Sequence, residues 1–212
     1  MSSHLVDGVP LPDAVGGHPA LDFCNTRAGW GAEHPKEYLT SPHALALWAA
    51  EAGLTPWPAT GSVGATGSDA VDALQRALHL RDALYRCALG TATGADWREL
   101  STAATAARAA ATLVPGPGGQ ASWVLDGDAG HPARLALHAA AGVAEHLVTS
   151  PLLGCVSACP GAGCGWLFAD TRRRRRWCSM AVCGNRAKAR RHAERRLGTP
   201  TRDKMLNNDH RA

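Results

Sequence analysis

The chain has 212 residues, 45% of them hydrophobic, which suits one fair-sized domain with a smaller one attached. Its first residues lack the basic start and apolar run of an export signal, and no stretch of about 18 apolar residues occurs, so we expect neither export nor a membrane partner. We expect a cytoplasmic protein in a reducing compartment, where clustered cysteines are more often metal ligands than disulfides.

The formal net charge of +4 conceals a strong asymmetry along the chain. Residues 1–169 contain 8 Lys/Arg and 14 Asp/Glu, whereas residues 170–196 contain 11 Lys/Arg and 2 Asp/Glu. Half of the basic side chains therefore lie in one short C-terminal segment. Such an asymmetry predicts an anionic partner for that end of the chain, most often a nucleic acid.

The N-terminal segment divides into two parts. Residues 1–16 show no periodicity and are predicted to form a loose lead-in. In residues 16–26, a Gly-Gly pair permits a tight backbone and a proline fits the first turn of a helix. The polar residues His18, Asp22 and Asn25 form a possible ligand site here. The alternative, which we favour, is that Asp22 and Asn25 cap backbone groups beside the following helix.

Apolar residues at helical spacing predict that a first domain, residues 1–150, is mostly helical. The expected helices run from Ser41 to Gly53, from Ser68 or Asp69 to about Leu89, from Asp96 to about Ala111, and from about Pro132 to Val148. Residues 55–68 and 115–120 are predicted loops, and residues 121–125 give the only strong strand signal in this domain. The expected fold class is therefore mainly α, with a short strand element.

The same helical spacing also predicts which side chains lie in the core of this domain. Trp97 and Leu100 are expected to anchor the helix that begins near Asp96. Cys24 and Cys87 lie on apolar faces and are expected to be buried thiols. Arg81 occurs at the spacing of the apolar residues in its helix, although it carries a charge.

The C-terminal segment contains two cysteine pairs, Cys159 with Cys164 and Cys178 with Cys183. Four residues separate the members of each pair, and thirteen residues separate the pairs. Zinc takes four tetrahedral ligands, with thiolate bonds of about 2.3 Å, so two short turns must each deliver two sulfurs. Four cysteine ligands leave no open position, which predicts one structural Zn²⁺. The alternative is that the cysteines pack or stay free, and Cys155 is expected to be a buried or spare thiol.

The layout expected for this small domain, residues 151–197, is treble-clef-like. A tight turn at residues 160–163 leads into a short strand at residues 166–168. The arginine run then returns as the second arm of a hairpin, and a helix begins at about Ser179 and carries Cys183 near its start. Residues 198–212 are predicted to be a flexible tail.

The basic residues of this domain are the predicted nucleic-acid contacts: Arg172, Arg173, Arg174, Arg175, Arg176, Arg186, Lys188, Arg190 and Arg191. A solvated charged face is the usual explanation of such a run. Here the charge is so dense that self-repulsion opposes folding unless an anion offsets it, and phosphates would do so. Neither a phosphate-binding loop nor a nucleophile elbow occurs, and the histidines have no metal spacing, so we expect no enzyme.

Two segments of the small domain, CPGAGCGWLFADT at residues 159–171 and RRWCSMAVCGNRAKARRH at residues 175–192, resemble the CGNR zinc finger. The segments GGHPALDFCNT (16–26), SPHALALW (41–48) and LHLRDALYR (78–86) resemble the ABATE domain that usually precedes this finger. Two features depart from the family pattern. Cys24 stands where an aliphatic residue is common, and the unbroken run of five arginines stands where a looser stretch of Ser, Arg, Asn and Gly is common.

This resemblance implies a helical sensory domain and a DNA-binding finger, in a family described as stress-induced transcription regulators. It also suggests that Gly184 lets the backbone approach the metal closely. Asn185 would brace the finger through hydrogen bonds to the hairpin, and Arg186 would have mixed bracing and DNA-binding roles.

The resulting hypothesis is a DNA-binding regulator whose first domain senses a small-molecule effector or a partner. Two alternatives remain. The finger could bind RNA, with Trp166 and Trp177 stacking on bases, although core positions are more usual for tryptophans in so small a module. It could instead be a protein-interaction module attached to a ligand-binding domain. A homodimer is possible, but no heptad seam supports one.

Overall fold

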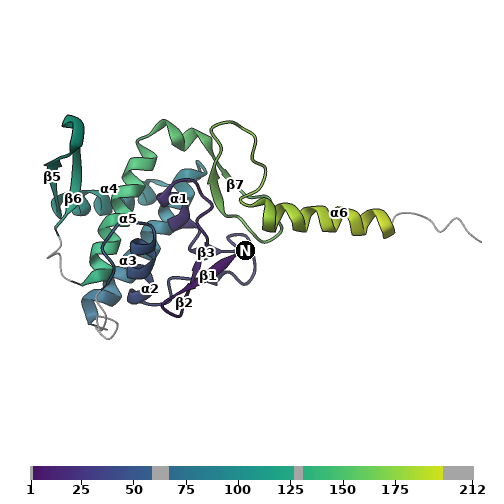
Figure 1. Ribbon diagram of the computed structural model, residues 1–212, viewed down its shortest axis with the longest axis horizontal. Coiled ribbons are helices and arrows are strands. Elements are labelled where there is room, and N and C mark those ends of the chain that lie inside the picture. The colour runs from purple at the N-terminus through teal and green to yellow at the C-terminus, as the bar shows by residue number, and fades with distance from the viewer. Residues whose placement is uncertain (1, 59–66, 127–130, 198–212) are drawn as a thin grey trace, which may run out of the picture.

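The computed structural model describes residues 2–58, 67–126 and 131–197 (Figure 1). A helical body is followed by a small C-terminal unit, from which the last described helix extends away from the rest of the molecule (Figure 1). The mainly α fold with a small cysteine-rich unit, predicted from the sequence, is confirmed. The predicted tail, residues 198–212, and the middle of the predicted loop at 55–68 lie outside the described residues.

The central element of the helical body is α5, a helix that contacts the four others around it. The helices are α1 (Pro19–Cys24), α2 (Pro42–Glu51), α3 (Ser68–Ala88), α4 (Gly94–Ala109) and α5 (Pro132–Val148). The buried side chains of α5 are mostly alanines, such as Ala136, Ala140 and Ala144. Their small size lets neighbouring helices approach closely, which is how a chain with few aromatics fills a core. None of the described helices is long and apolar enough to cross a membrane.

Local signals set where the helices begin. The Ser41 hydroxyl accepts a hydrogen bond from the backbone N–H of Ala44, and a proline follows at the first helical position, as predicted. Thr93 and Asp96 form a reciprocal capping box, so α4 begins at Gly94, two residues before the predicted start. The ring Nδ1 of His131 accepts from Ala133 and caps α5 in the same way.

The core of the helical body consists mostly of leucines and alanines, with Phe23, Trp48 and two thiols, and one predicted anchor lies outside it. Cys24 and Cys87 are buried as expected, and Leu100 is 6% exposed. Trp97, by contrast, is 45% exposed. The capping box explains this error because it turns Asp96 inward, and the next residue along a helix points about 100° away.

The N-terminal residues are ordered, contrary to the prediction of a loose lead-in. Strands β1 (Ser3–Val6) and β2 (Val9–Pro12) form an antiparallel hairpin. The turn between them is Asp7-Gly8, and both residues have positive φ angles, 46° and 78°. An Asp-Gly pair between apolar residues is a strong hairpin signal, so the sequence contained the information that the periodicity argument missed.

A second hairpin joins α4 to α5. The predicted strand at residues 121–125 exists as β6 (Ala121–Leu125), and it pairs with β5 (Ala111–Pro115), which the sequence analysis did not identify. Leu113, Trp123 and Val124 are all about half exposed, so neither face of the hairpin is buried in a core. This hairpin projects from one end of the helical body, as Figure 1 shows.

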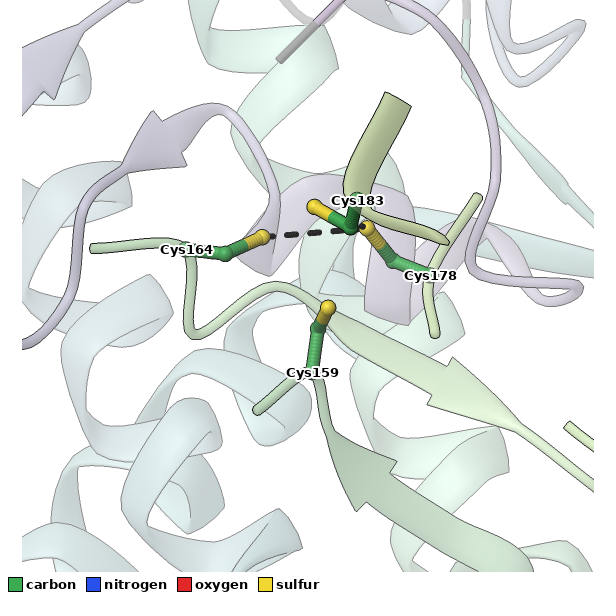
Figure 2. Close-up of side chains that lie close together, drawn as sticks. All are labelled: Cys159, Cys164, Cys178 and Cys183. Atoms are coloured by element: carbon green, nitrogen blue, oxygen red, sulfur yellow. Dashed lines mark hydrogen bonds between the residues drawn. The ribbon is translucent and has the colours of Figure 1, made fainter. Parts of the chain in front are cut away.

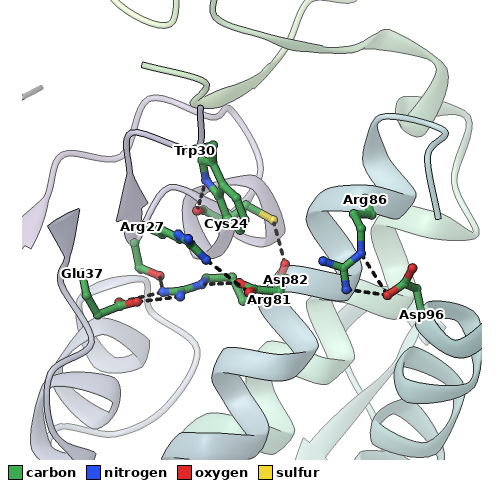
Figure 3. A network of polar contacts seen from close by, with 9 residues as sticks. Cys24, Arg27, Trp30, Glu37, Arg81, Asp82, Arg86 and Asp96 are labelled. Carbon is green, nitrogen blue, oxygen red and sulfur yellow. Dashed lines mark hydrogen bonds and ion pairs between the residues drawn. The ribbon is translucent and has the colours of Figure 1, made fainter. Parts of the chain in front are cut away.

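Arg81 is the most deeply buried charged side chain of the described residues, at 2% exposure. Figure 3 shows its guanidinium between the two strands that follow α1 and the helix α3. It donates to both carboxylate oxygens of Glu37, at 2.7 and 2.6 Å, and to the Thr26 hydroxyl at 3.0 Å. Glu37 ends the short strand β4 (Lys36–Glu37), which pairs with β3 (Arg27–Ala28). The paired charge explains how arginine occupies an otherwise apolar position in α3.

Candidate zinc centre and basic surface

The first cysteine pair lies in the turn of a hairpin formed by β7 (Val156–Ala158) and β8 (Leu167–Ala169). The Cys159 N–H donates to the carbonyl of Trp166 at 2.8 Å, and the turn closes with positive φ angles at Gly163 and Gly165. These angles suit glycine, and they bend the chain so that both cysteine side chains point to the same side. A one-turn helix, η3 (Pro151–Cys155), connects this hairpin to α5.

The arginine run is not the second arm of a hairpin, as the sequence analysis expected. Residues 172–176 form an irregular loop, while the partner of β8 is β7. Asp170 organises the start of this loop, because its carboxylate accepts from the Arg175 N–H at 2.6 Å and its carbonyl accepts from the Arg173 N–H. Adjacent arginines repel one another, so a turn held by a carboxylate is a more stable arrangement for them than a strand.

The second cysteine pair is delivered by the chain that follows this loop. Cys178 lies in a bend, and Cys183 lies in η4 (Met180–Gly184), a single π-helical turn that leads into α6 (Asn185–Leu197). Gly184 is buried there, and a Cβ atom at this position would lie 2.7 Å from the Met180 sulfur. Because Met180 is a flexible side chain that is itself about half exposed, a small displacement of it would make room for a larger residue at position 184.

The four sulfurs converge on one point, as Figure 2 shows. All four lie within 4.8 Å of one another, and the Sγ atoms of Cys164 and Cys183 each lie 3.7 Å from that of Cys178. A tetrahedral zinc site with bonds of about 2.3 Å has sulfur–sulfur edges of about 3.8 Å. The cluster therefore fits one Zn²⁺ held by Cys159, Cys164, Cys178 and Cys183, the set predicted from their spacing.

The electrostatics of the cluster also favour a cation. The hydrogen bond from Cys178 lowers the pKa of the Cys164 thiol to about 5, so one thiolate forms readily. Burial, together with the negative charge of Cys164, raises the pKa of Cys183 to about 12. Four thiolates this close repel one another unless a divalent cation neutralises them, and zinc deprotonates the thiols that bind it. Because all four sites around the metal are protein sulfurs, the zinc would stabilise structure.

The remaining cysteines lie outside this cluster. Cys155 is half-buried in η3 and does not belong to the group of converging sulfurs. Burial raises the pKa of Cys24 strongly, so this thiol stays protonated in the core.

The finger is attached to the helical body by the segment at residues 16–26. The side-chain amide of Asn25, which is fully buried, donates to the Leu167 carbonyl at 2.9 Å and accepts from the Leu167 N–H at 2.7 Å. One side chain therefore pairs with β8 as a strand would. Two backbone bonds extend the contact, from Ala169 to the Gly16 carbonyl and from Gly29 to the Cys164 carbonyl.

Aromatic side chains complete this junction. Trp166 is buried as predicted and donates its indole N–H to the Arg27 carbonyl at 3.1 Å. Trp30 stacks on Tyr85, and the Tyr85 hydroxyl donates to the Gly165 carbonyl at 2.8 Å. A Cβ at Gly165 would lie 2.8 Å from that of Trp30, so only glycine fits this close approach.

The proposed ligand residues of the first domain have their polar atoms occupied within the protein. The Asp22 carboxylate accepts from the backbone N–H groups of Val15 and Gly16, at 2.9 and 2.7 Å. His18 caps α1 through Nδ1, and its Nε2 lies 3.1 Å from Nδ1 of His146. Asn25 holds β8. The bonds of Asp22 agree with the capping alternative, whereas Asn25 pairs with a strand far along the chain instead of capping a neighbouring group.

The basic residues of the finger form two groups: those whose side chains contact other parts of the protein, which we call braces, and those without such a partner. Arg175 is a brace, because its guanidinium donates to the carbonyls of Val15 at 2.8 Å and Cys178 at 2.6 Å; its role as a nucleic-acid contact stays a prediction. Arg176 lies over the Trp177 ring, Arg190 pairs with Glu194 at 3.7 Å, and Arg191 donates to the Ala187 carbonyl. Among the nine predicted nucleic-acid contacts, all of which lie in the described residues, five side chains make no hydrogen bond, ion pair or ring contact: Arg172, Arg173, Arg174, Arg186 and Lys188.

Beside the zinc cluster lies a hollow of about 250 Å³ that the sequence analysis did not anticipate. It is lined by Trp177, Cys183, Arg186 and Arg190, with the turn at residues 161–162 on the other side. Asn185, expected to bond to the hairpin, instead donates to the Ala181 carbonyl one helical turn back. The hollow therefore stays open between the first turn of α6 and the cysteine turn.

Two family models match the chain. The ABATE model, described as "Putative stress-induced transcription regulator", matches residues 17–151. The CGNR zinc finger matches residues 156–196. No curated protein matches the chain. These two matches confirm both resemblances identified from the sequence and place them in the same order along the chain.

Proposed function

Because the chain belongs to the ABATE family and ends in a CGNR zinc finger, we propose that it is a regulator whose finger binds DNA and whose helical domain senses an effector. Zinc holds the finger's two cysteine turns together in this proposal and takes no part in chemistry. The helical domain supports the finger through Asn25 and Trp30. The function is that of a regulator, and no catalytic step is part of it.

The observation that carries the proposal is the exposed basic face around α6. In the described part of this helix Ala187 alone is buried, and α6 extends away from the body (Figure 1). A helix without an apolar face gains no stability from packing, and Arg186 and Arg190 repel each other across one turn. A phosphate backbone would offset this repulsion, and a helix of this width fits the major groove of DNA.

The hollow beside the zinc cluster supports the same proposal. Arg186 and Arg190 line it from α6, and the partly exposed Trp177 lines it from the arginine loop. Two guanidinium groups around a small concavity suit a phosphate oxygen, since arginine binds phosphates through paired N–H donors. The contacts of this hollow would position the finger on the backbone, and base contacts would come from the exposed side of α6.

The test is a fluorescence-anisotropy titration of the zinc-loaded protein with duplex DNA at several salt concentrations. We expect the affinity to fall steeply with salt, and the double variant Arg186→Ala/Arg190→Ala to reduce the slope by about 2, because each lost phosphate contact removes about 0.9. The matched control is Arg76→Ala/Arg98→Ala, which removes the same charge from α3 and α4 and should leave the slope unchanged.

Absence of binding at low salt, or equal slopes in the two double variants, would contradict the proposal. Competition with single-stranded and structured RNA distinguishes the alternative nucleic-acid partner. Trp177 stacking on a base would then make RNA the stronger competitor, and Trp177→Ala would weaken RNA binding more than DNA binding.

A further inference from the structure

The helical domain contains a cleft of about 480 Å³ far along the chain from the zinc cluster. It lies between the β5–β6 hairpin and the helices α4 and α5, with residues 54–56 closing one side. Its wall is mostly apolar and includes Leu54, Trp123, Leu135 and Val143. A volume of this size is typical of sites for small organic molecules.

A buried polar side chain without a partner faces this cleft. His138 lines it from the middle of α5, is only 7% exposed, and makes no hydrogen bond within the described residues. The ring nitrogens of His138 are not among the fully enclosed polar atoms, so they remain accessible from the cleft and are available to a ligand there. Burial, followed by the positive charges of Arg134 and Arg76, lowers the pKa of His138, so the ring is neutral and offers one donor and one acceptor.

A second polar group converges on the same space. Arg108 of α4 also lines the cleft, with its guanidinium 4.8 Å from the centre of the Trp123 ring. Its Nε donates to Glu145 at 2.8 Å, whereas its terminal nitrogens have no hydrogen bond within the described residues. These nitrogens are donors without acceptors, and the described residues that line the cleft include no carboxylate; Glu145, the partner of the Arg108 Nε, is not among them.

We propose that this cleft binds a small hydrophobic acid, with its apolar ring against Trp123 and Leu135 and its acidic group at His138 and Arg108. The exposed tryptophan of the hairpin would be covered by such a ligand, which accounts for an apolar side chain held over a cleft rather than in a core. The inference rests on the proposed function only in naming this ligand the effector; binding itself does not depend on DNA.

The test uses 8-anilinonaphthalene-1-sulfonate, an aromatic anion that fluoresces in apolar sites, with the zinc-loaded full chain and no DNA present. Gly142 of α5 lines the cleft, and a Cβ there meets no atom within 4 Å. Gly142→Phe therefore fills the cleft, and Gly142→Ala is the matched control. We expect saturation at one probe per chain, an affinity loss of at least about tenfold for Gly142→Phe, and a change below about twofold for Gly142→Ala.

His138→Leu keeps the apolar volume but removes the polar partner, and it should weaken the probe about fivefold or more. Equal affinity in both Gly142 variants, or a probe that does not saturate, would overturn the proposal. A dimer by sedimentation whose cleft takes no probe would assign this face to a second copy and overturn it too. A failure here leaves the salt-dependent DNA titration unaffected, and a failure of DNA binding leaves this titration unaffected.

Discussion

The helical domain and the zinc finger differ in what fills their interiors. The first buries leucines such as Leu45, Leu80 and Leu84 against the alanine face of α5, in a cluster drawn from every helix of the domain. The second buries four cysteines with Trp166 and Phe168, and its cluster also includes Ala28 and Tyr38 from the helical domain. The finger therefore lacks a core of its own, since a segment this small and basic buries too little apolar surface.

From this difference we infer a one-way dependence: the finger depends on the helical domain for its stability, whereas the helical domain does not depend on the finger. The helical domain has an interior that does not need the metal, whereas the finger needs both the metal and the surface formed by residues 16–30. Substitutions in the finger, in the helical core and at the junction test this dependence.

The largest effect should follow from removing a zinc ligand. We expect Cys178→Ser to abolish stoichiometric zinc binding and the order of α6, because the free energy of binding a structural zinc, on the order of 10 kcal/mol, is the folding free energy of such a module. Metal analysis and circular dichroism measure this. Cys155→Ser is the control and should retain one zinc per chain. A variant that keeps its zinc without Cys178 would contradict the assignment.

Removing a core leucine should destabilise the helical domain and leave zinc binding by the finger intact, the reverse of removing a zinc ligand. Leu84 is fully buried in α3, and Leu84→Ala is expected to lower the free energy of unfolding by about 3 kcal/mol, from lost burial and the cavity left behind. Urea unfolding measures it. Val71→Ala, at a half-exposed position of the same helix, should cost less than about 0.5 kcal/mol. The folded Leu84→Ala protein should still hold one zinc, and loss of the metal in that state would refute the one-way dependence.

The junction itself should give an intermediate effect. Asn25→Ala leaves the N–H and carbonyl of Leu167 buried without partners, so we expect a loss of about 2 kcal/mol in urea unfolding of the zinc-loaded protein. Asn185→Ala is the matched control, because that exposed side chain makes one bond within its own helix. The cost at Asn25 should shrink when a chelator removes the zinc. An undiminished cost would mean that the junction survives without the metal.

The smallest effect concerns pH and belongs to the helical domain alone. The hydrogen bond from Arg86 holds the pKa of Asp96 below its usual value of 3.8, with help from Thr93. A carboxyl group whose pKa is lower in the folded state stabilises the fold above its unfolded pKa, and this stability is lost as the pH falls below that value. Asp96→Asn should therefore lower the melting temperature at pH 7, and its difference from the parent protein should narrow below about pH 4.

Glu33→Gln is the control for this comparison, since Glu33 is 90% exposed and should not alter the melting temperature at either pH. A gap between Asp96→Asn and the parent protein that widens in acid would contradict the assignment of the shift to the bond with Arg86. Zinc content should stay constant at pH 7 in both variants, which separates this effect from that of the finger.

Much of the zinc site could be predicted from the sequence, because the features that form it involve residues only a few positions apart. The cysteine spacing, the glycines of the turns and the Ser41-Pro42 cap act over a few residues, and each has the role in the structure that its pattern predicted. The hairpin at residues 3–12 was also encoded locally, by Asp7-Gly8, and was missed because periodicity was used in place of turn chemistry. The clustering of basic residues at the C-terminal end was also evident from the sequence.

Only the tertiary structure decided which polar residues are free and which are occupied. Arg175 and Arg172 are the same residue type in the same run, yet the guanidinium of Arg175 donates to three backbone carbonyls, one of them that of Val15 far along the chain, whereas Arg172 makes no such bond. Asn25 and His138 give a second contrast: a candidate ligand residue pairs with a strand 142 residues away, while a histidine for which the sequence indicated no role faces an open cleft. Partners so distant in sequence leave no periodic signal, because the packing of whole helices brings them together.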